Sequence, residues 1–127
     1  PDGKIEIGMG IHGEPGIMLS DRMPADELVD MLMKKLLDDM PLAERDRVSV
    51  MINGLGATSL EELYIVYRAV QKKLSNIGVS IVMPHVGEYS TSMEMAGMSI
   101  SIFKLDEELE GLLADEAITP FYTNVNK

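Results

Sequence analysis

The apolar and polar positions of this chain repeat with two different periods. Alternation at every second position predicts four strands, at 5–9 with a continuation to Ile11, at 48–52, at 79–83 and at 98–103. The last of these runs alternates most cleanly, which favours an antiparallel or edge strand.

Spacings of three and four predict two amphipathic helices. The first begins at Pro24, a residue suited to the first helical turn, and ends before Pro41. Its apolar stripe contains Leu28, Met31, Leu32, Leu36 and Met40. The second begins at Thr58 or Ser59, because each stands three residues before a glutamate in a capping box, and it ends at Gly78. Its stripe contains Leu60, Leu63, Tyr64, Tyr67, Val70 and Leu74.

The remaining segments are shorter. Asn53-Gly54-Leu55-Gly56 is expected to stop the second strand, and 90–95 to form a short helical turn. An acidic helix is predicted at 106–113 and an extended tail at 119–124. Strands alternating with helices, with crossovers long enough for parallel pairing, predict an α/β layered sandwich in which helices flank a mixed sheet. Residues 1–127 are expected to form a single domain.

Composition narrows the function classes. The 127 residues suffice for one compact domain. With 11 Lys and Arg against 21 Asp and Glu, the formal charge is -10, which disfavours nucleic acid as a partner. No apolar run is long enough to span a bilayer and no signal-peptide pattern is present, so we expect a cytoplasmic protein. The absence of cysteine excludes disulfides and thiolate chemistry.

Two further features concern assembly. The chain starts at Pro1 rather than Met, which is typical of a fragment of a longer protein. Two amphipathic helices and a methionine-rich strand favour self-association, and we expect a homodimer.

Gly8-Met9-Gly10-Ile11-His12-Gly13 matches the dinucleotide-binding pattern G-x-G-x-x-G. That pattern must open a helix, but Glu14-Pro15-Gly16 follows and no helix is predicted before Pro24. The nearby carboxylate would also repel phosphate. A nucleotide-binding module is therefore disfavoured, and the glycines are expected to let a small ligand approach His12.

His12 is one of two histidines and lies in a Gly/Pro loop at the end of a predicted strand. There it could act as a general base, a metal ligand or a nucleophile toward a carbonyl, with Glu14 near enough to orient it. It could equally anchor the loop through the backbone. A metal site is the weaker option, because no second His or Cys stands at ligand spacing.

The other candidate sites have simpler explanations. Residues 53–58 could present amide groups to an anion, although a tight turn followed by a helix cap explains them as well. His85 follows Pro84 in a loop and is interpreted as structural. The methionines at 93, 95 and 98 are more typical of a core or a domain contact than of a cofactor site.

Four ordered segments resemble the dihydroxyacetone-binding subunit of dihydroxyacetone kinases. They are Gly10-Ile11-His12-Gly13-Glu14-Pro15-Gly16; the run from Val50 to Tyr64, similar to N-x-L-G-x-T-x-x-E-L-Y; the run from Val86 to Ser99, similar to G-x-Y-x-T-S-x-D-M-x-G-x-S with Glu94 where Asp is usual; and the tail from Lys104 to Pro120. The resemblance identifies the chain as the C-terminal domain of that two-domain subunit.

The resemblance implies that His12 holds dihydroxyacetone covalently as a hemiaminal, within a substrate loop that includes Gly10, Gly13 and Glu14. It also implies that the acid/base residues lie on an N-terminal domain. ATP with Mg²⁺, or another phosphoryl donor, would belong to a separate nucleotide-binding kinase subunit or domain. The isolated chain is therefore expected to be inactive. The family also resembles paralogues that bind dihydroxyacetone but act as co-activators, which is the alternative function.

Overall fold

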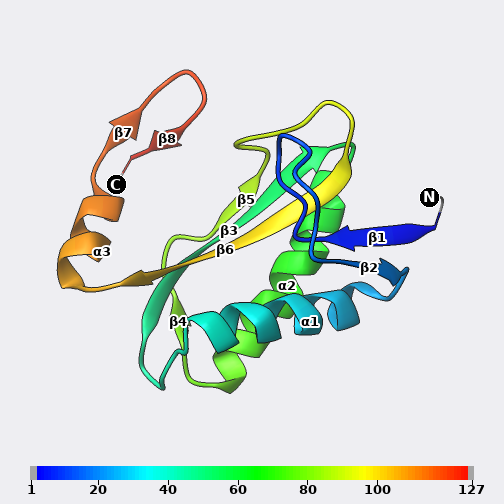
Figure 1. Cartoon of the computed structure of the whole chain (residues 1–127). Helices are drawn as coiled ribbons and strands as arrows, with labels where there is room; N and C mark the ends of the chain where they lie inside the picture. The colour runs from blue at the N-terminus through cyan, green and yellow to red at the C-terminus, as the bar shows by residue number, and fades with distance from the viewer. Residues whose placement is uncertain (1–2, 126–127) are drawn as a thin grey trace.

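The computed structural model describes residues 3–125 and confirms the α/β class, with a mixed sheet built around β3 (Arg47–Gly56). β6 (Ala96–Leu105) pairs antiparallel with β3 along its whole length. β4 (Ser80–Ile81) and β5 (His85–Gly87) pair parallel with successive parts of the opposite edge of β3. The cleanly alternating segment is thus the antiparallel strand, as expected (Figure 1).

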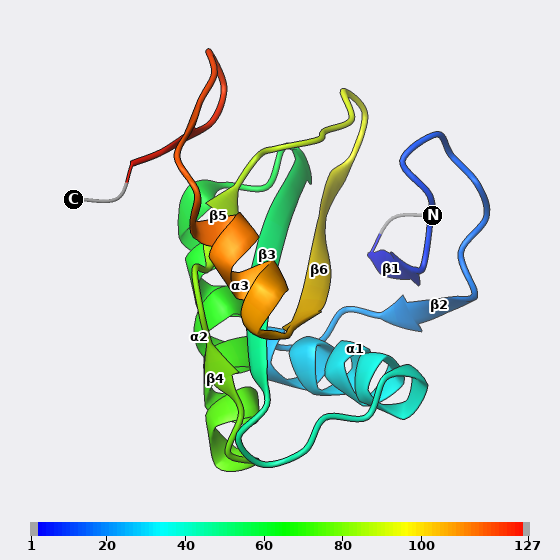
Figure 2. The same cartoon turned by 90° about the vertical axis from the view of Figure 1, so that its left-hand side faces the viewer.

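Helices α1 (Ala25–Asp39) and α2 (Leu60–Asn76) cover the same face of this sheet (Figures 1 and 2). Alternate residues of β3 point toward them, so that Val48, Val50 and Ile52 are fully buried. The remaining members of this core come from both helices and the segment before β4: Val29, Met33, Leu63, Val66, Val70, Leu74 and Val79.

The apolar stripe predicted for α1 is wrong, because it leaves out the two residues of this helix that are fully buried. Val29 and Met33 are the buried residues of this helix. The predicted positions are only half-buried: Leu28, Met31, Leu32, Leu36 and Met40. The apolar arc of α1 is wide, and the contact with α2 and the sheet decides which line within that arc lies deepest.

The stripe of α2 is confirmed at Leu63, Val70 and Leu74. It is wrong at Leu60 and Tyr64, which are exposed, and it lacks Val66, which is buried. The start of this helix is confirmed in the second of the two registers, because the Ser59 hydroxyl accepts a bond from the Glu62 N–H and the Glu62 carboxylate accepts one from the Ser59 N–H.

The central strand continues where a stop was predicted. Asn53-Gly54 lies inside β3, so the turn expected there is wrong: both residues pair with β6, and Asn53 also pairs with β5 on the other side. The strand predicted at 79–83 is confirmed only as β4, at Ser80–Ile81, and it ends before Met83, which has a positive φ of 51°. The next segment, expected to be a loop around His85, instead forms β5. The helical turn expected at 90–95 is an irregular loop instead.

A separate two-stranded hairpin precedes the helices. The first predicted strand is confirmed but ends early, as β1 (Lys4–Ile7), and it pairs antiparallel with β2 (Met18–Asp21), which the sequence pattern does not reveal. The hairpin stands beside α1 and apart from the main sheet (Figure 1). The strand that precedes His12 is therefore not a member of the main sheet.

The second face of the sheet carries the C-terminal elements. The acidic helix is confirmed as α3 (Glu107–Ala114), capped by the Asp106 carboxylate, which accepts a bond from the Leu109 N–H at 2.8 Å. The tail is not simply extended, because β7 (Ala117–Ile118) and β8 (Thr123–Asn124) form a small hairpin. α3 lies on the side of the sheet opposite α1 and α2 (Figure 2).

Candidate functional site

The loop at 8–17 joins the strands of the first hairpin and carries His12. Gly8 ends β1 with a φ of 79°, a conformation that favours glycine. Within the loop the Gly10 N–H donates to the Glu14 carbonyl at 3.0 Å, and the Gly13 N–H donates to the Gly10 carbonyl at 3.0 Å. These two bonds bring the three predicted loop residues, Gly10, Gly13 and Glu14, together around His12.

The imidazole of His12 is open to solvent, with 89% of the side chain exposed. Its backbone N–H donates to Glu14 Oε2 at 3.2 Å, and its Nδ1 lies 3.7 Å from Glu14 Oε1. Glu14 is therefore beside His12 in space as well as in sequence. An exposed imidazole on a tightly bonded loop is accessible to a ligand or to a covering domain.

A cavity of about 640 Å³ separates the hairpin from the rest of the domain. Its walls include Gly8 and Met9 of the His12 loop, Leu28 and Leu32 of α1, and the segment 94–98. The two leucines are half-buried because they face this cavity rather than the core. The His12 loop and the segment before β6, which are far apart in the sequence, are thus neighbours across one cavity.

The loop at 88–95 contributes to the wall of that cavity through Glu94 and Met95, and the side chain of Asn53 bonds to the backbone of this loop. Asn53 is buried, with 4% of the residue exposed, and its Nδ2 donates to the Ser90 carbonyl at 2.6 Å. Its Oδ1 accepts from the N–H groups of Tyr89 and Ser90, at 2.8 and 3.1 Å. Sequence reasoning placed Asn53 in a turn and missed this role, although the threonine-serine segment of the family pattern marks the loop that it holds.

The amide groups at the end of β3 are engaged by the same loop. The Gly56 N–H donates to Thr91 Oγ1 at 2.9 Å, and the Ala57 N–H donates to the Met95 carbonyl at 2.8 Å. The Ser59 N–H is bound by the Glu62 carboxylate. The Gly56 and Ala57 N–H groups therefore already have partners within the chain, which favours the turn and helix cap over the anion site considered for this junction.

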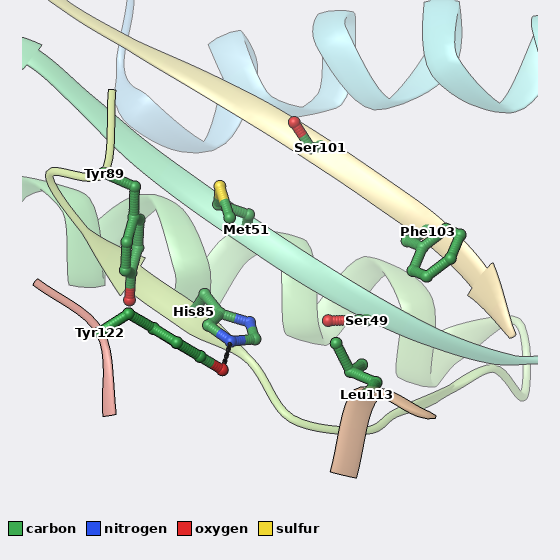
Figure 3. A pocket seen from close by; sticks show the side chains of 8 residues that line it. All are labelled: Ser49, Met51, His85, Tyr89, Ser101, Phe103, Leu113 and Tyr122. Carbon is green, nitrogen blue, oxygen red and sulfur yellow. Dashed lines mark hydrogen bonds between the residues drawn. The ribbon is translucent and has the colours of Figure 1, made fainter. Parts of the chain in front are cut away.

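His85 lies on the other face of the sheet, in a second cavity of about 440 Å³ (Figure 3). Its Nε2 shares a hydrogen bond with the Tyr122 hydroxyl at 2.9 Å, and its ring meets Tyr89 edge to face at a centroid distance of 5.9 Å. Desolvation raises the pKa of the Tyr89 hydroxyl, with smaller contributions from Tyr122 and Tyr64. The pairing with Tyr122, on the C-terminal hairpin, supports the structural interpretation of His85.

The described residues offer no cluster of three or more His, Cys, Asp or Glu side chains suited to a metal ion. Within residues 3–125, no helix has the length and apolar character needed to cross a membrane. His12 and His85 belong to different elements, on the first hairpin and on β5, and the structure does not bring them into one site.

The family comparison and the search of known proteins agree on one family. The Dak1 domain matches residues 1–121. The chain is 47% identical over 121 residues to the dihydroxyacetone-binding subunit of the PTS-dependent dihydroxyacetone kinase 2 of Listeria innocua. That match covers 95% of this chain and 37% of the relative, so the chain spans well under half of that subunit.

Solved structures of related proteins share the fold. A dihydroxyacetone kinase from C. freundii, in complex with AMP-PNP and Mg²⁺, superimposes with a TM-score of 0.81 at 32% identity, covering 98% of this chain and 22% of that one. A dihydroxyacetone kinase operon co-activator, Dha-DhaQ, superimposes with a TM-score of 0.83 at 28% identity, covering 91% of this chain and 37% of that one.

Proposed function

The chain belongs to the Dak1 domain family, and on that premise we propose that it is the substrate-holding domain of a dihydroxyacetone kinase subunit. In this proposal His12 forms a covalent hemiaminal with dihydroxyacetone and presents a terminal hydroxyl for phosphorylation to dihydroxyacetone phosphate. The observation that carries the proposal is the exposed imidazole of His12, held on a loop whose shape is fixed by internal backbone bonds.

The chemistry needs only an imidazole nitrogen with a free lone pair. That nitrogen adds to the ketone carbon, the carbonyl π bond breaks, and one proton passes from the imidazole to the new hydroxyl, so the adduct contains every atom of both molecules. Glycerol has no carbonyl carbon and cannot form the bond. The reaction is reversible, which allows the product to leave.

The phosphoryl donor belongs to another part of the complete protein in this proposal. The net charge of -10 opposes the binding of a polyphosphate such as ATP. The donor site, whether for ATP or for a phosphoryl carrier, and the acid/base residues are then supplied by an N-terminal domain and a partner kinase subunit. A homodimer remains part of the proposal.

The alternative is a dihydroxyacetone-binding co-activator without kinase activity, which the superposition on the co-activator structure supports. The kinase function is favoured, because the chain is 47% identical in sequence to a kinase subunit and, among the superimposed structures, is 32% identical to the kinase against 28% to the co-activator. Both functions use His12 to hold the ligand, and they differ in the residues of the N-terminal domain.

A domain exchange tests the proposal. The matched segment of the Listeria innocua subunit is replaced by this chain, and the intact mass of the chimera is measured by native mass spectrometry with dihydroxyacetone or glycerol. We expect an adduct of one whole dihydroxyacetone, without loss of water, and none with glycerol. His12→Ala should abolish the adduct and His85→Ala should retain it. An undiminished adduct in His12→Ala would contradict the proposed role.

Phosphorylation is measured separately. The 127-residue chain alone, incubated with ATP, Mg²⁺ and dihydroxyacetone, is expected to produce no dihydroxyacetone phosphate. Product formed by the chain alone would show that the donor site lies within it.

A further inference from the structure

The shape of the His12 loop depends on the side chain of Glu14. The Glu14 carbonyl accepts the Gly10 N–H, and the Glu14 carboxylate turns back to accept the His12 N–H at 3.2 Å. The same residue therefore bonds to both sides of the turn that carries the imidazole. Backbone and carboxylate bonds together fix where Glu14 lies relative to His12.

Gly10 leaves the space that this carboxylate occupies. A Cβ added at Gly10 would lie 1.9 Å from Glu14 Oε2 and 2.7 Å from its Cδ, distances that no real Cβ adopts. Any side chain at Gly10 would therefore displace the carboxylate. Gly13 differs, because no atom lies within 4 Å of an added Cβ there, and its φ of 85° is the reason for glycine.

The second carboxylate oxygen of Glu14 faces one particular nitrogen of His12. Oε1 lies 3.7 Å from Nδ1, which is a close electrostatic contact rather than a direct hydrogen bond. Both side chains are exposed and can close the gap by a small rotation. A carboxylate only accepts hydrogen bonds, so it favours the form of the imidazole that carries its proton on Nδ1.

We propose that Glu14 is a positioning residue that keeps the proton of neutral His12 on Nδ1 and so leaves Nε2, with its lone pair, as the nitrogen that adds to the substrate carbonyl. A neutral imidazole has one N–H, and the hydrogen bond made by one nitrogen decides which of them is protonated. When Nε2 adds to the carbonyl, the Nδ1 proton must leave and the carbinol oxygen must gain one. The carboxylate beside Nδ1 stabilises the positive charge that develops on the ring until that proton leaves. The assignment of Nε2 as the nucleophile rests on the proposed function; the Nδ1–H form does not.

The first test needs no substrate. The ¹⁵N-labelled 127-residue chain is studied by two-dimensional NMR of its histidine rings, in solution alkaline enough for neutral imidazoles. We expect His12 to show a protonated Nδ1 and a lone pair on Nε2 in the wild type, and to shift toward the Nε2–H form in Glu14→Gln. Glu6→Gln is the matched control, because the Glu6 carboxylate also bonds this loop, at the Gly16 N–H, but not at His12. It should leave the His12 signals unchanged.

Gly10→Ala provides a second, independent variant. It keeps the charge of Glu14 but displaces the carboxylate, so it should shift His12 in the same direction as Glu14→Gln. The backbone amide spectrum of each variant reports whether the domain remains folded. The inference is overturned if His12 carries its proton on Nε2 in the wild type, or if Glu14→Gln and Gly10→Ala leave it on Nδ1.

The second test uses the chimera and the adduct measurement. Loss of a carboxylate that orients a metal-binding histidine typically costs 10- to 100-fold. By analogy, for this exposed pair we expect about a tenfold lower affinity for dihydroxyacetone in Glu14→Gln. Glu6→Gln should bind as the wild type does. If no adduct forms even with Glu14 intact, the proposed function fails while the NMR result stands; if adducts form equally well in Glu14→Gln, the positioning role alone fails.

Discussion

The contact between Asn53 and the loop at 88–95 gives a quantitative prediction. Asn53→Ala removes three hydrogen bonds, one to the Ser90 carbonyl and two from the N–H groups of Tyr89 and Ser90. At a net value of about 1 kcal/mol each, the loss would be about 3 kcal/mol. Tyr89 and Ser90 are exposed, so water can take over part of the bonding. We expect the free energy of unfolding to fall by about 2 kcal/mol.

The assay is urea denaturation of the 127-residue chain, combined with hydrogen exchange of individual amides. The amides of Tyr89 and Ser90 should lose protection in Asn53→Ala, whereas those of the helices should change only with global stability. Asn124→Ala is the control, because its Nδ2 also donates to two carbonyls, of Leu113 and Asp115, but on the small C-terminal hairpin. It should cost about half as much or less.

Asn53→Asp tests the donor role of the Asn53 side chain separately from its acceptor role. The variant can still accept from Tyr89 and Ser90, but it places a carboxylate oxygen where Nδ2 now meets the Ser90 carbonyl at 2.6 Å. At neutral pH it should therefore be no more stable than Asn53→Ala. The reasoning is refuted if Asn53→Ala loses less than about 0.5 kcal/mol, or if Tyr89 and Ser90 keep their protection.

Two further predictions concern other contacts. Gly56→Ala should lower the free energy of unfolding by about 3 kcal/mol or more, because Gly56 has a φ of 77° and an added Cβ would lie 2.0 Å from the Met95 carbonyl oxygen. Gly13 has a similar φ but open space around an added Cβ, so Gly13→Ala should lower the free energy of unfolding by only about 1 kcal/mol. If urea denaturation gives equal losses for the two variants, the contact with Met95 is not the cause. Arg47 donates two hydrogen bonds to the Glu110 carboxylate, and these bonds lower the pKa of that carboxyl below its ordinary value of 4.5. Desolvation raises the pKa by a smaller amount, and the positive charge of Arg47 lowers it further. A carboxyl with a lowered pKa in the folded state contributes stability that is present above pH 4.5 and is lost as the pH falls through the folded-state pKa. The difference in free energy of unfolding between wild type and Glu110→Gln should therefore shrink in acid. A difference that is constant with pH would contradict the ion pair with Arg47.

The sequence alone predicted those features that depend on local chemistry. The capping box at Ser59 lies within three residues of the groups that it binds, so the start of α2 follows from the local pattern. The exposed loop around His12 was predicted for the same reason, because its glycines, proline and carboxylate act on their own neighbours. The role of His12 as a nucleophile stays a prediction that rests on the family resemblance.

Only the tertiary structure decided the features that depend on partners far away in the sequence. Asn53-Gly54 has the local chemistry of a turn, yet it remains in β3. Both residues pair with β6, Asn53 also pairs with β5, and the Asn53 side chain bonds to the loop at 88–95. The buried line of α1 follows from its contacts with α2 and the sheet rather than from its own apolar arc. The bond between His85 and Tyr122 joins residues 37 positions apart. Long-range pairing can outweigh a local preference worth about 1 kcal/mol or less, and no pattern within a short window records it.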